Sequence, residues 1–208
     1  MPDFNPLDLA IKIAVLLIAI IGHEIMHGFV ALKYGDTTAK LAGRLSVNPI
    51  KHIDIFGSIL LPLGLFLLNA PFLFGWAKPV PVDIRKVIEN GDFNGAIAVS
   101  LAGIAYNLFI ALLAAIILRT FFGDIGGLQG VSGILAYFLV LCVIYNVVLA
   151  VFNLLPIPPL DGSQALGYLS LKFGSDKIPL FFNRIERFGI VIVMAVLFFG
   201  AKFLAIPI

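Results

Sequence analysis

Two histidines and a glutamate stand close together in the first apolar segment of the chain. They are His23, Glu24 and His27, in the pattern H-E-x-x-H. On a helix, residues four apart share a face, so both imidazoles can reach one metal ion. Glu24 lies about 100° around the helix from His23, near such a metal but not on it. The pattern predicts a zinc ion with an open position for water, and a carboxylate that acts as general base.

Ionisable residues inside an apolar segment need a strong partner, because burying them in lipid is costly. The alternative to a metal is that His23 and His27 form hydrogen bonds to neighbouring helices, with Glu24 paired to one of them. We favour the metal, since one divalent cation compensates all three groups at once. The first motif therefore predicts a metal site inside the membrane part of the chain.

A catalytic zinc site commonly has three protein ligands, so the two histidines leave one ligand to find. His52 is the only other histidine, and Asp161 is the outstanding carboxylate. Asp161 follows a run of prolines and precedes Gly162, a sequence that ends a helix, forces an extended path and permits a tight turn. Asp161 could instead cap the helix that follows it. We interpret His52 as a surface or loop-anchoring residue rather than a ligand.

The composition indicates what kind of scaffold must position these residues. Of the 208 residues, 61% are hydrophobic and 12% are charged, and the mean hydropathy is +1.07. Soluble domains average about 25% charged residues, so this chain is an integral membrane protein. A net charge of +2 without a long basic run excludes nucleic acid as a partner. The single cysteine, Cys142, excludes an intramolecular disulfide framework.

Apolar segments of about 20 residues can span a bilayer as helices. Four segments qualify, at residues 7–32, 95–118, 131–152 and 188–206. A fifth apolar stretch, 53–76, contains Pro62, Asn69 and Pro71, so it is either a kinked span or a re-entrant hairpin. Residues 39–48 partly alternate apolar and polar side chains, which fits a short surface strand or hairpin, or else an irregular loop.

The basic residues favour one topology. Eleven of the 14 lysines and arginines lie in three loops, at residues 33–52, 77–94 and 153–187. If 53–76 is re-entrant, all three loops share one side of the membrane, and the positive-inside rule makes that side the cytosol. We therefore expect a re-entrant 53–76, an N-terminus outside the cell and a multi-pass protein of the cell membrane.

At its two motifs the chain resembles the site-2 protease family of intramembrane zinc metalloproteases, in particular the small prokaryotic branch without a PDZ domain. The family pattern N-x-x-P-x-x-P-L-D-G matches Asn153 to Gly162 at every fixed position. Its G-x-x-x-N pattern matches Gly103 to Asn107, although Ile104 stands where a proline often follows the glycine. The resemblance covers nearly the whole chain, so we expect a single transmembrane protease domain over 1–208.

The resemblance implies an all-α polytopic membrane protein with one zinc ion per chain, held by His23, His27 and Asp161. It also implies an active site toward the cytosolic side. Glu24 would be the general base, and Asn107 and Asn153 are candidate donors to the oxyanion, or else form bonds between helices. The expected partners are the lipid bilayer and a transmembrane helix of another protein. That helix must unwind before cleavage, and residues 39–48 could receive it by edge pairing.

Two other classes of protein are weighed against this one. A transporter or channel would spread ionisable residues along several helices, whereas here they concentrate in two motifs. A structural zinc site usually closes with four protein ligands, often cysteines, and the only cysteine lies in a different apolar run from the histidines. The sequence identifies neither the substrate nor the oligomeric state.

Overall fold

The computed structural model describes residues 5–67, 76–123 and 129–204, and in that part of the chain every regular element is a helix. The α-helices are α1 (Pro6–Lys33), α2 (Thr38–Leu41), α3 (Leu61–Leu67), α4 (Ile84–Phe122), α5 (Gly130–Leu154), α6 (Asp161–Lys172), α7 (Lys177–Ile185) and α8 (Gly189–Leu204). Short 3-10 turns cover Pro49–His52 and Glu186–Phe188, and a π-helical turn covers Ile55–Leu60. The all-helical fold class is therefore confirmed.

Three helices are long and apolar enough to cross a membrane. They are α1, α4 and α5, with 28, 39 and 25 residues. They correspond to three of the four predicted spans. The fourth predicted span, 188–206, corresponds to α8, which has only 16 residues. Because a straight crossing needs about 20 residues, the structure does not confirm this span, and it stays a prediction.

Local sequence sets the ends of α1. The side chain of Asn5 accepts hydrogen bonds from the backbone N–H groups of Leu7 and Asp8, and Pro6 occupies the first turn, where its missing N–H costs nothing. At the other end Gly35 has a φ of +84°, a conformation open to glycine. The helix therefore ends just beyond the H-E-x-x-H motif, and both histidines stay within regular helix.

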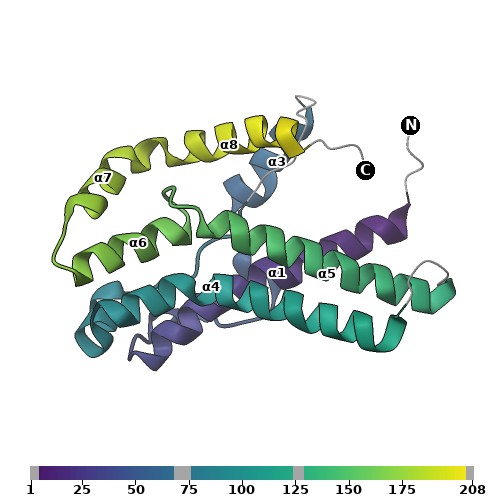
Figure 1. Ribbon diagram of the computed structural model, residues 1–208, viewed down its shortest axis with the longest axis horizontal. Helices are drawn as coiled ribbons and strands as arrows, with labels where there is room; N and C mark the ends of the chain where they lie inside the picture. Colours follow the sequence, from purple (N-terminus) through teal and green to yellow (C-terminus); the bar gives the residue numbers. More distant parts are fainter. Residues whose placement is uncertain (1–4, 68–75, 124–128, 205–208) are drawn as a thin grey trace.

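Helix α4 is bent at Asp92, which has a φ of 50° and a ψ of −159°. This residue separates a short first part of the helix from the long apolar part. The predicted span 95–118 begins just after the bend. The bend lets the amphipathic start of the helix leave the direction of the bundle, as Figure 1 shows at the left of the molecule.

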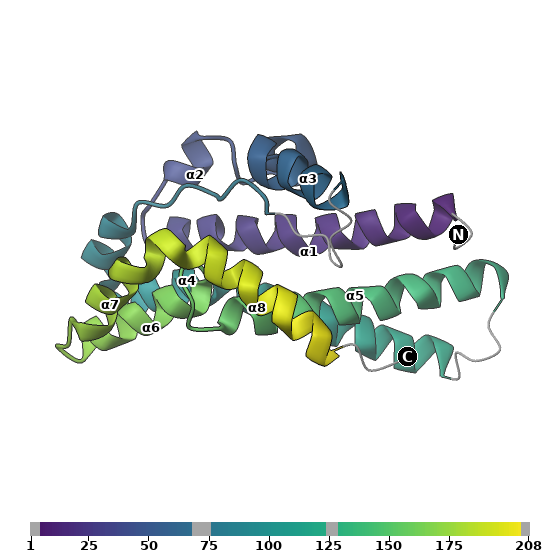
Figure 2. The same cartoon turned by 90° about the horizontal axis from the view of Figure 1, so that it is seen from above.

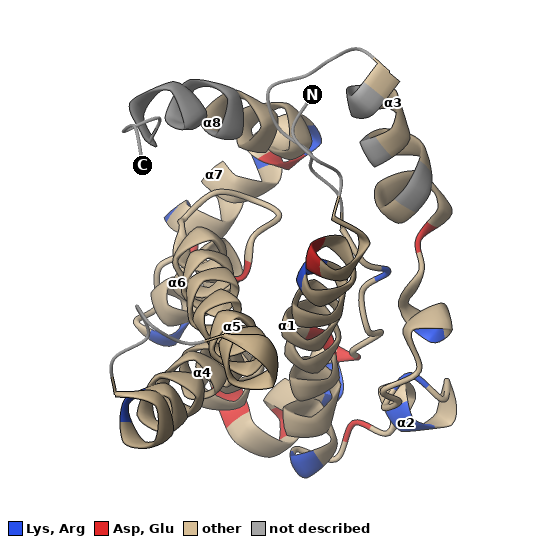
Figure 3. Ribbon diagram, turned by 90° about the vertical axis from the view of Figure 1, so that its right-hand side faces the viewer, with Lys and Arg blue, Asp and Glu red and all other residues tan. Residues whose placement is uncertain are grey.

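The three long helices lie side by side, with α4 packed against both α1 and α5 (Figures 1 and 3). Small side chains allow this close approach, as they do in membrane helix pairs generally. The buried positions of α4 include Ala96, Ala102, Gly103, Ala111 and Ala114. Helix α6 packs on α4 near its start, and Figure 2 shows α6 and α7 together at the end of the bundle away from the N-terminus. Residues from the two ends of the sequence therefore meet along α4.

The predicted strand or hairpin at 39–48 is wrong. Residues 38–41 form the short helix α2, and the backbone that follows turns at Gly43, with a φ of +64°. The cause is Asp36, a buried carboxylate that accepts hydrogen bonds from the N–H and the hydroxyl of Thr38. These bonds form a turn just before α2 and favour a helical turn over an extended strand. The edge that was expected to pair with a substrate is therefore not present at 39–48.

The two ends of the apolar stretch 53–76 lie next to each other in the structure. Its described part contains the π-helical turn and α3, with Pro62 in α3, whereas Asn69 and Pro71 lie outside the described residues. The N–H of Trp76 donates to the carbonyl of Gly57 at 3.2 Å, and the N–H of Lys78 donates to the carbonyl of His52 at 2.8 Å. A full crossing would separate these residues by the thickness of a bilayer, about 30 Å. The geometry agrees with the re-entrant interpretation.

Candidate metal centre

Side chains from α1 and from the start of α6 converge on one point. Nε2 of His23 lies 3.0 Å from Oδ2 of Asp161, and Nε2 of His27 lies 3.3 Å from the same oxygen. One ligand atom from each residue lies within 4.8 Å of the other two. All three side chains are largely buried, with exposed fractions of 7%, 13% and 13%. The structure thus brings together three residues of which the first, His23, and the last, Asp161, are 138 positions apart in the sequence.

Asp161 reaches this point because α5 stops before it. Helix α5 ends at Leu154, and the prolines at 156, 158 and 159 carry the chain into α6 without continuing the helix. A Cβ at Gly162 would lie 2.1 Å from the carbonyl oxygen of Leu154, so only glycine fits there. Asp161 makes no side-chain cap of α6. Its carboxylate is instead free to face the histidines.

The other ring nitrogen of each histidine is held by an oxygen. Nδ1 of His27 lies 2.7 Å from the carbonyl oxygen of Val99, and Nδ1 of His23 lies 2.7 Å from Oδ1 of Asn107. A carbonyl oxygen only accepts, so in a neutral imidazole Nδ1 carries the proton and Nε2 presents its lone pair. This is the arrangement in which metal-binding histidines are usually held.

The cluster fits a zinc ion. A tetrahedral ion with bonds of about 2.0–2.1 Å separates its ligand atoms by about 3.3 Å, close to the two distances to Asp161. Within the described part of the chain, Oδ2 of Asp161 is buried and has no hydrogen-bond partner. Two imidazole nitrogens and a carboxylate oxygen thus face one another at short range, an arrangement that a cation stabilises. Two nitrogens and one oxygen are also a ligand set that zinc accepts.

Similarity to known proteins identifies the family to which the chain belongs. The sequence pattern of Peptidase family M50 matches residues 124–198, which include Asp161 but neither histidine. A Bacillus subtilis (strain 168) protein with the provisional name zinc metalloprotease YwhC is 39% identical over 166 residues, or 78% of this chain and 71% of the relative. The chain belongs to peptidase family M50. This is the site-2 protease family that its motifs resemble, and membership makes the chain a metallopeptidase.

Other relatives of this M50 chain carry similar provisional names. The zinc metalloprotease Rip2 of Mycolicibacterium smegmatis is 34% identical over 154 residues, which cover 74% of this chain and 55% of that protein. The zinc metalloprotease MJ0611 of Methanocaldococcus jannaschii is 32% identical over 165 residues, which cover 79% of this chain and 73% of the relative. This chain therefore spans about half the length of Rip2. No solved structure gives a significant match.

Glu24 lies beside the cluster of His23, His27 and Asp161 but outside it. Its Oε2 accepts a hydrogen bond of 2.9 Å from the backbone N–H of Val80, in the non-helical segment that precedes α4. The side chain is partly buried. An N–H donor fixes the direction of a carboxylate. The structure therefore holds Glu24 next to His23 without making it a member of the convergent set.

The G-x-x-x-N pattern packs directly against His23. A Cβ at Gly103 would lie 2.5 Å from three atoms of the His23 ring, so the glycine makes room for the imidazole. One turn further along α4, Asn107 is fully buried and accepts the hydrogen of Nδ1. Its Nδ2 donates to the carbonyl of Ala19 and to Oδ1 of Asn146. Both amide hydrogens are engaged, so this geometry does not favour Asn107 as a donor to an oxyanion.

Asn153 and His52 are not among the residues that converge on this point. Nδ2 of Asn153 donates one hydrogen bond of 3.0 Å to the carbonyl of Leu149, one turn back in α5, which leaves a second amide hydrogen for another acceptor. His52 is buried and lies 2.7 Å from the carbonyl oxygen of Ser46. This contact agrees with His52 as a residue that anchors a loop rather than as a metal ligand.

Sequence reasoning missed three partners of the site. Two of them, the carbonyl of Val99 and the N–H of Val80, are backbone groups and leave no trace in residue type. The third, Asn146, had a visible signal, because it is a polar residue in the middle of an otherwise apolar helix. Such residues inside membrane helices usually face the bundle interior and have a function.

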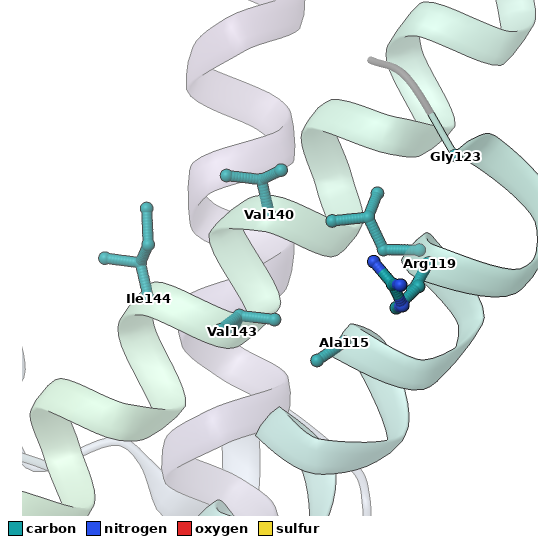
Figure 4. Close-up of a pocket in the computed structure, with 7 residues that line it drawn as sticks. Ala115, Arg119, Gly123, Val140, Val143 and Ile144 are labelled. Atoms are coloured by element: carbon teal, nitrogen blue, oxygen red, sulfur yellow. The ribbon is translucent and has the colours of Figure 1, made fainter.

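A cavity of about 300 Å³ lies between α4 and α5 toward the loop that joins them, and Figure 4 shows Arg119, Val140 and Val143 at its wall. Its lining includes none of the residues of the metal cluster. The cluster therefore does not depend on this cavity.

Proposed function

We propose that this M50 protein is an intramembrane zinc metalloprotease that hydrolyses peptide bonds within or near transmembrane segments of other membrane proteins. The observation that carries the proposal is the convergence of His23, His27 and Asp161 inside a bundle of membrane-length helices. A soluble metallopeptidase has no need to bury its ligands between apolar helices. The location of the cluster therefore supports a substrate that is itself in the membrane.

We infer that His23, His27 and Asp161 hold one zinc ion per chain. A zinc ion bound there would lower the pKa of a water molecule toward about 7 and polarise the scissile carbonyl. The two Nδ1–H bonds, to Asn107 and to Val99, keep the imidazole lone pairs directed at the ion. The bundle around these residues limits the access of bulk water, which strengthens each electrostatic contact.

Glu24 is proposed as the general base. It would accept a proton from the attacking water and later deliver it to the leaving amine. The N–H of Val80 holds the carboxylate at the edge of the cluster. Asn153 is the better candidate for a donor to the oxyanion, because one of its amide hydrogens is free of the bond to Leu149. Asn107 instead orients His23.

The substrate is proposed to be a transmembrane helix that unwinds locally, since a regular helix hides its amides in its own hydrogen bonds. The bundle is open to lipid over much of its surface, and the long helices expose large apolar side chains such as Leu16, Phe109 and Val148. The proposed topology places the basic loops and the cluster toward the cytosol of the cell membrane. Water would enter from that side.

Purified protein in detergent tests the proposal. The metal content is measured by mass spectrometry, and cleavage of a protein with a single transmembrane helix is followed on a gel. We expect about one zinc ion per chain, loss of cleavage with a strong chelator, and recovery when zinc is restored. Zinc bound without any cleavage of helical substrates would instead indicate a structural site and would contradict the proposed function.

A further inference from the structure

Asn146 is a fully buried amide in the apolar helix α5. Its Nδ2 donates a hydrogen bond of 2.9 Å to the carbonyl of Cys142, one turn back in the same helix. Its Oδ1 accepts a hydrogen bond of 2.8 Å from Nδ2 of Asn107 in α4. An amide buried without partners would cost several kcal/mol. Asn146 avoids that cost by bonding at both ends, and one of its partners contacts the metal cluster.

Two backbone carbonyls decide which way both amides point. A backbone carbonyl only accepts, so the Asn146 atom that faces the carbonyl of Cys142 is the nitrogen. By the same reasoning, the Asn107 atom that faces the carbonyl of Ala19 at 3.1 Å is also the nitrogen. The opposite atom of Asn107, which faces His23, is therefore the oxygen. The orientations of both amides therefore follow from their hydrogen-bond partners, and not from which end of each amide was drawn as nitrogen.

We propose that Asn146 is a positioning residue that fixes the tautomer of His23 through Asn107. The proposal rests on the proposed function only in taking His23 as a metal ligand. The chain of bonds runs from the carbonyl of Cys142 through Asn146 and Asn107 to Nδ1 of His23. It crosses from α5 to α4 to α1. Its effect is to hold the proton on Nδ1 and the lone pair on Nε2, the atom that faces Asp161.

The consequence of losing Asn146 follows from the same geometry. Asn107 would keep one nitrogen bond, to Ala19, and would lose the other. The bond to Ala19 alone would then hold the amide, so a larger fraction of chains would have it rotated, with N–H rather than oxygen facing His23. Nδ1 would become an acceptor, and the proton would move to Nε2. A protonated Nε2 has no lone pair for a metal, so the fraction of chains with a competent site would fall.

The test is the zinc affinity of Asn146→Leu, a change that keeps the branched shape of the side chain and removes both polar atoms. Zinc dissociation constants are measured in detergent by competition with a coloured chelator. We expect a loss of about tenfold, at the lower end of the effect of removing an outer partner of a metal ligand. Cys142→Ala is the matched control. It trims a buried side chain one turn away in α5 and leaves the backbone carbonyl of Cys142 in place, so its zinc affinity should equal that of the parent.

A double-mutant cycle separates positioning from general packing. Asn107→Leu should lower zinc affinity by more than Asn146→Leu, and Asn146→Leu should have no further effect when Asn107 is already leucine. Losses that multiply in the double variant would show that Asn146 does not act through Asn107, and would overturn the proposal. An Asn146→Leu affinity equal to that of the parent would overturn it as well.

Nitrogen NMR of [15N]histidine-labelled, metal-free protein gives a second reading that needs neither zinc nor cleavage. The parent should show Nδ1 of His23 protonated, and Asn146→Ala should show a fraction of His23 with Nδ1 unprotonated. An unchanged tautomer in this variant would contradict the proposal.

The positioning role and the proposed function can fail independently of each other. A parent that binds zinc and cleaves nothing loses the function but not the positioning role, and a zinc-dependent protease with an indifferent Asn146 loses only the positioning role.

Discussion

The backbone N–H of Val80 donates a hydrogen bond of 2.9 Å to Oε2 of Glu24, across 56 residues of sequence. Val80 lies in the segment between residues 76 and 83, which is fixed at several other points. Arg44 donates to the carbonyl of Lys78 at 2.6 Å, and the N–H of Asp83 donates to Oδ2 of Asp36 at 2.7 Å. The segment is thus held by the chain that follows α1 and, through Glu24, contacts α1 itself, where it orients the proposed general base.

Removing this N–H tests its contribution. Val80→Pro deletes the donor, and Val80→Ala keeps the donor while trimming the same buried side chain. Because a hydrogen bond to a charged group contributes about 1.5–3 kcal/mol, we expect kcat for a helical substrate to be about tenfold or more lower in the proline variant than in the alanine variant. Zinc content should be equal in both. Equal kcat values would show that Val80 does not position Glu24.

Gly103 is predicted to be intolerant of any side chain. Gly103→Ala would place a Cβ 2.5 Å from the ring of His23, so we expect zinc affinity to fall by about tenfold or more. Gly167→Ala is the control, because a Cβ there meets only Pro179, at 3.9 Å. Both changes favour helix by up to about 1 kcal/mol. If the two variants bound zinc equally well, the close packing of Gly103 on His23 would have no role in the metal site.

Asp36 should make stability depend on pH. Burial raises the pKa of its carboxyl, but hydrogen bonds from Thr38 and Asp83 and the charge of Lys86 together bring it below the ordinary value of 3.8. A lowered pKa in the folded state stabilises the protein fully above 3.8, and this contribution is lost as the pH falls through the lowered value. The melting temperature of the parent should therefore exceed that of Asp36→Asn at neutral pH.

The difference between these two melting temperatures should shrink as the pH falls below 4. Its size at neutral pH should correspond to about 1.5–3 kcal/mol, the usual contribution of hydrogen bonds to a charged group. A difference that stayed constant down to pH 2 would mean that the ionisation of Asp36 does not stabilise the turn between α1 and α2.

Asp161→Ala is predicted to release the metal. It leaves two imidazoles, and a zinc ion held by two protein ligands is bound far more weakly than one held by three. Zinc per chain after dialysis should fall well below one, whereas Gln164→Ala, an exposed change one turn along α6, should leave it unchanged. Retention of a full equivalent of zinc by Asp161→Ala would remove Asp161 from the ligand set.

Much of the fold could be predicted because its signals are local. The spans at 7–32, 95–118 and 131–152 follow from uninterrupted apolar runs, and the structure places helices over all of them. The error at 39–48 has a local cause that alternation does not reveal, since the carboxylate of Asp36, which bonds to Thr38, lies just outside the alternating stretch. The fourth span remained a prediction because the helix there has 16 residues.

The site was predictable to the extent that it consists of side chains with distinctive chemistry. His23, His27 and Asp161 were singled out by residue type and by two motifs, and the structure brings their ligand atoms together. What holds them is less visible in sequence, because backbone groups such as the carbonyl of Val99 have no residue signature. Asn107 was recognised from its motif, but which of its atoms face His23 depends on the packing of three helices.

The central claim is that Glu24 performs proton transfer at a zinc site that it does not itself form. Glu24→Gln tests it most directly, with zinc content and cleavage of a transmembrane-helix substrate measured on the same purified preparation. We predict about one zinc ion per chain and a loss of cleavage of about 10²–10⁴-fold, the usual contribution of a general base. Full cleavage activity in Glu24→Gln would contradict the account.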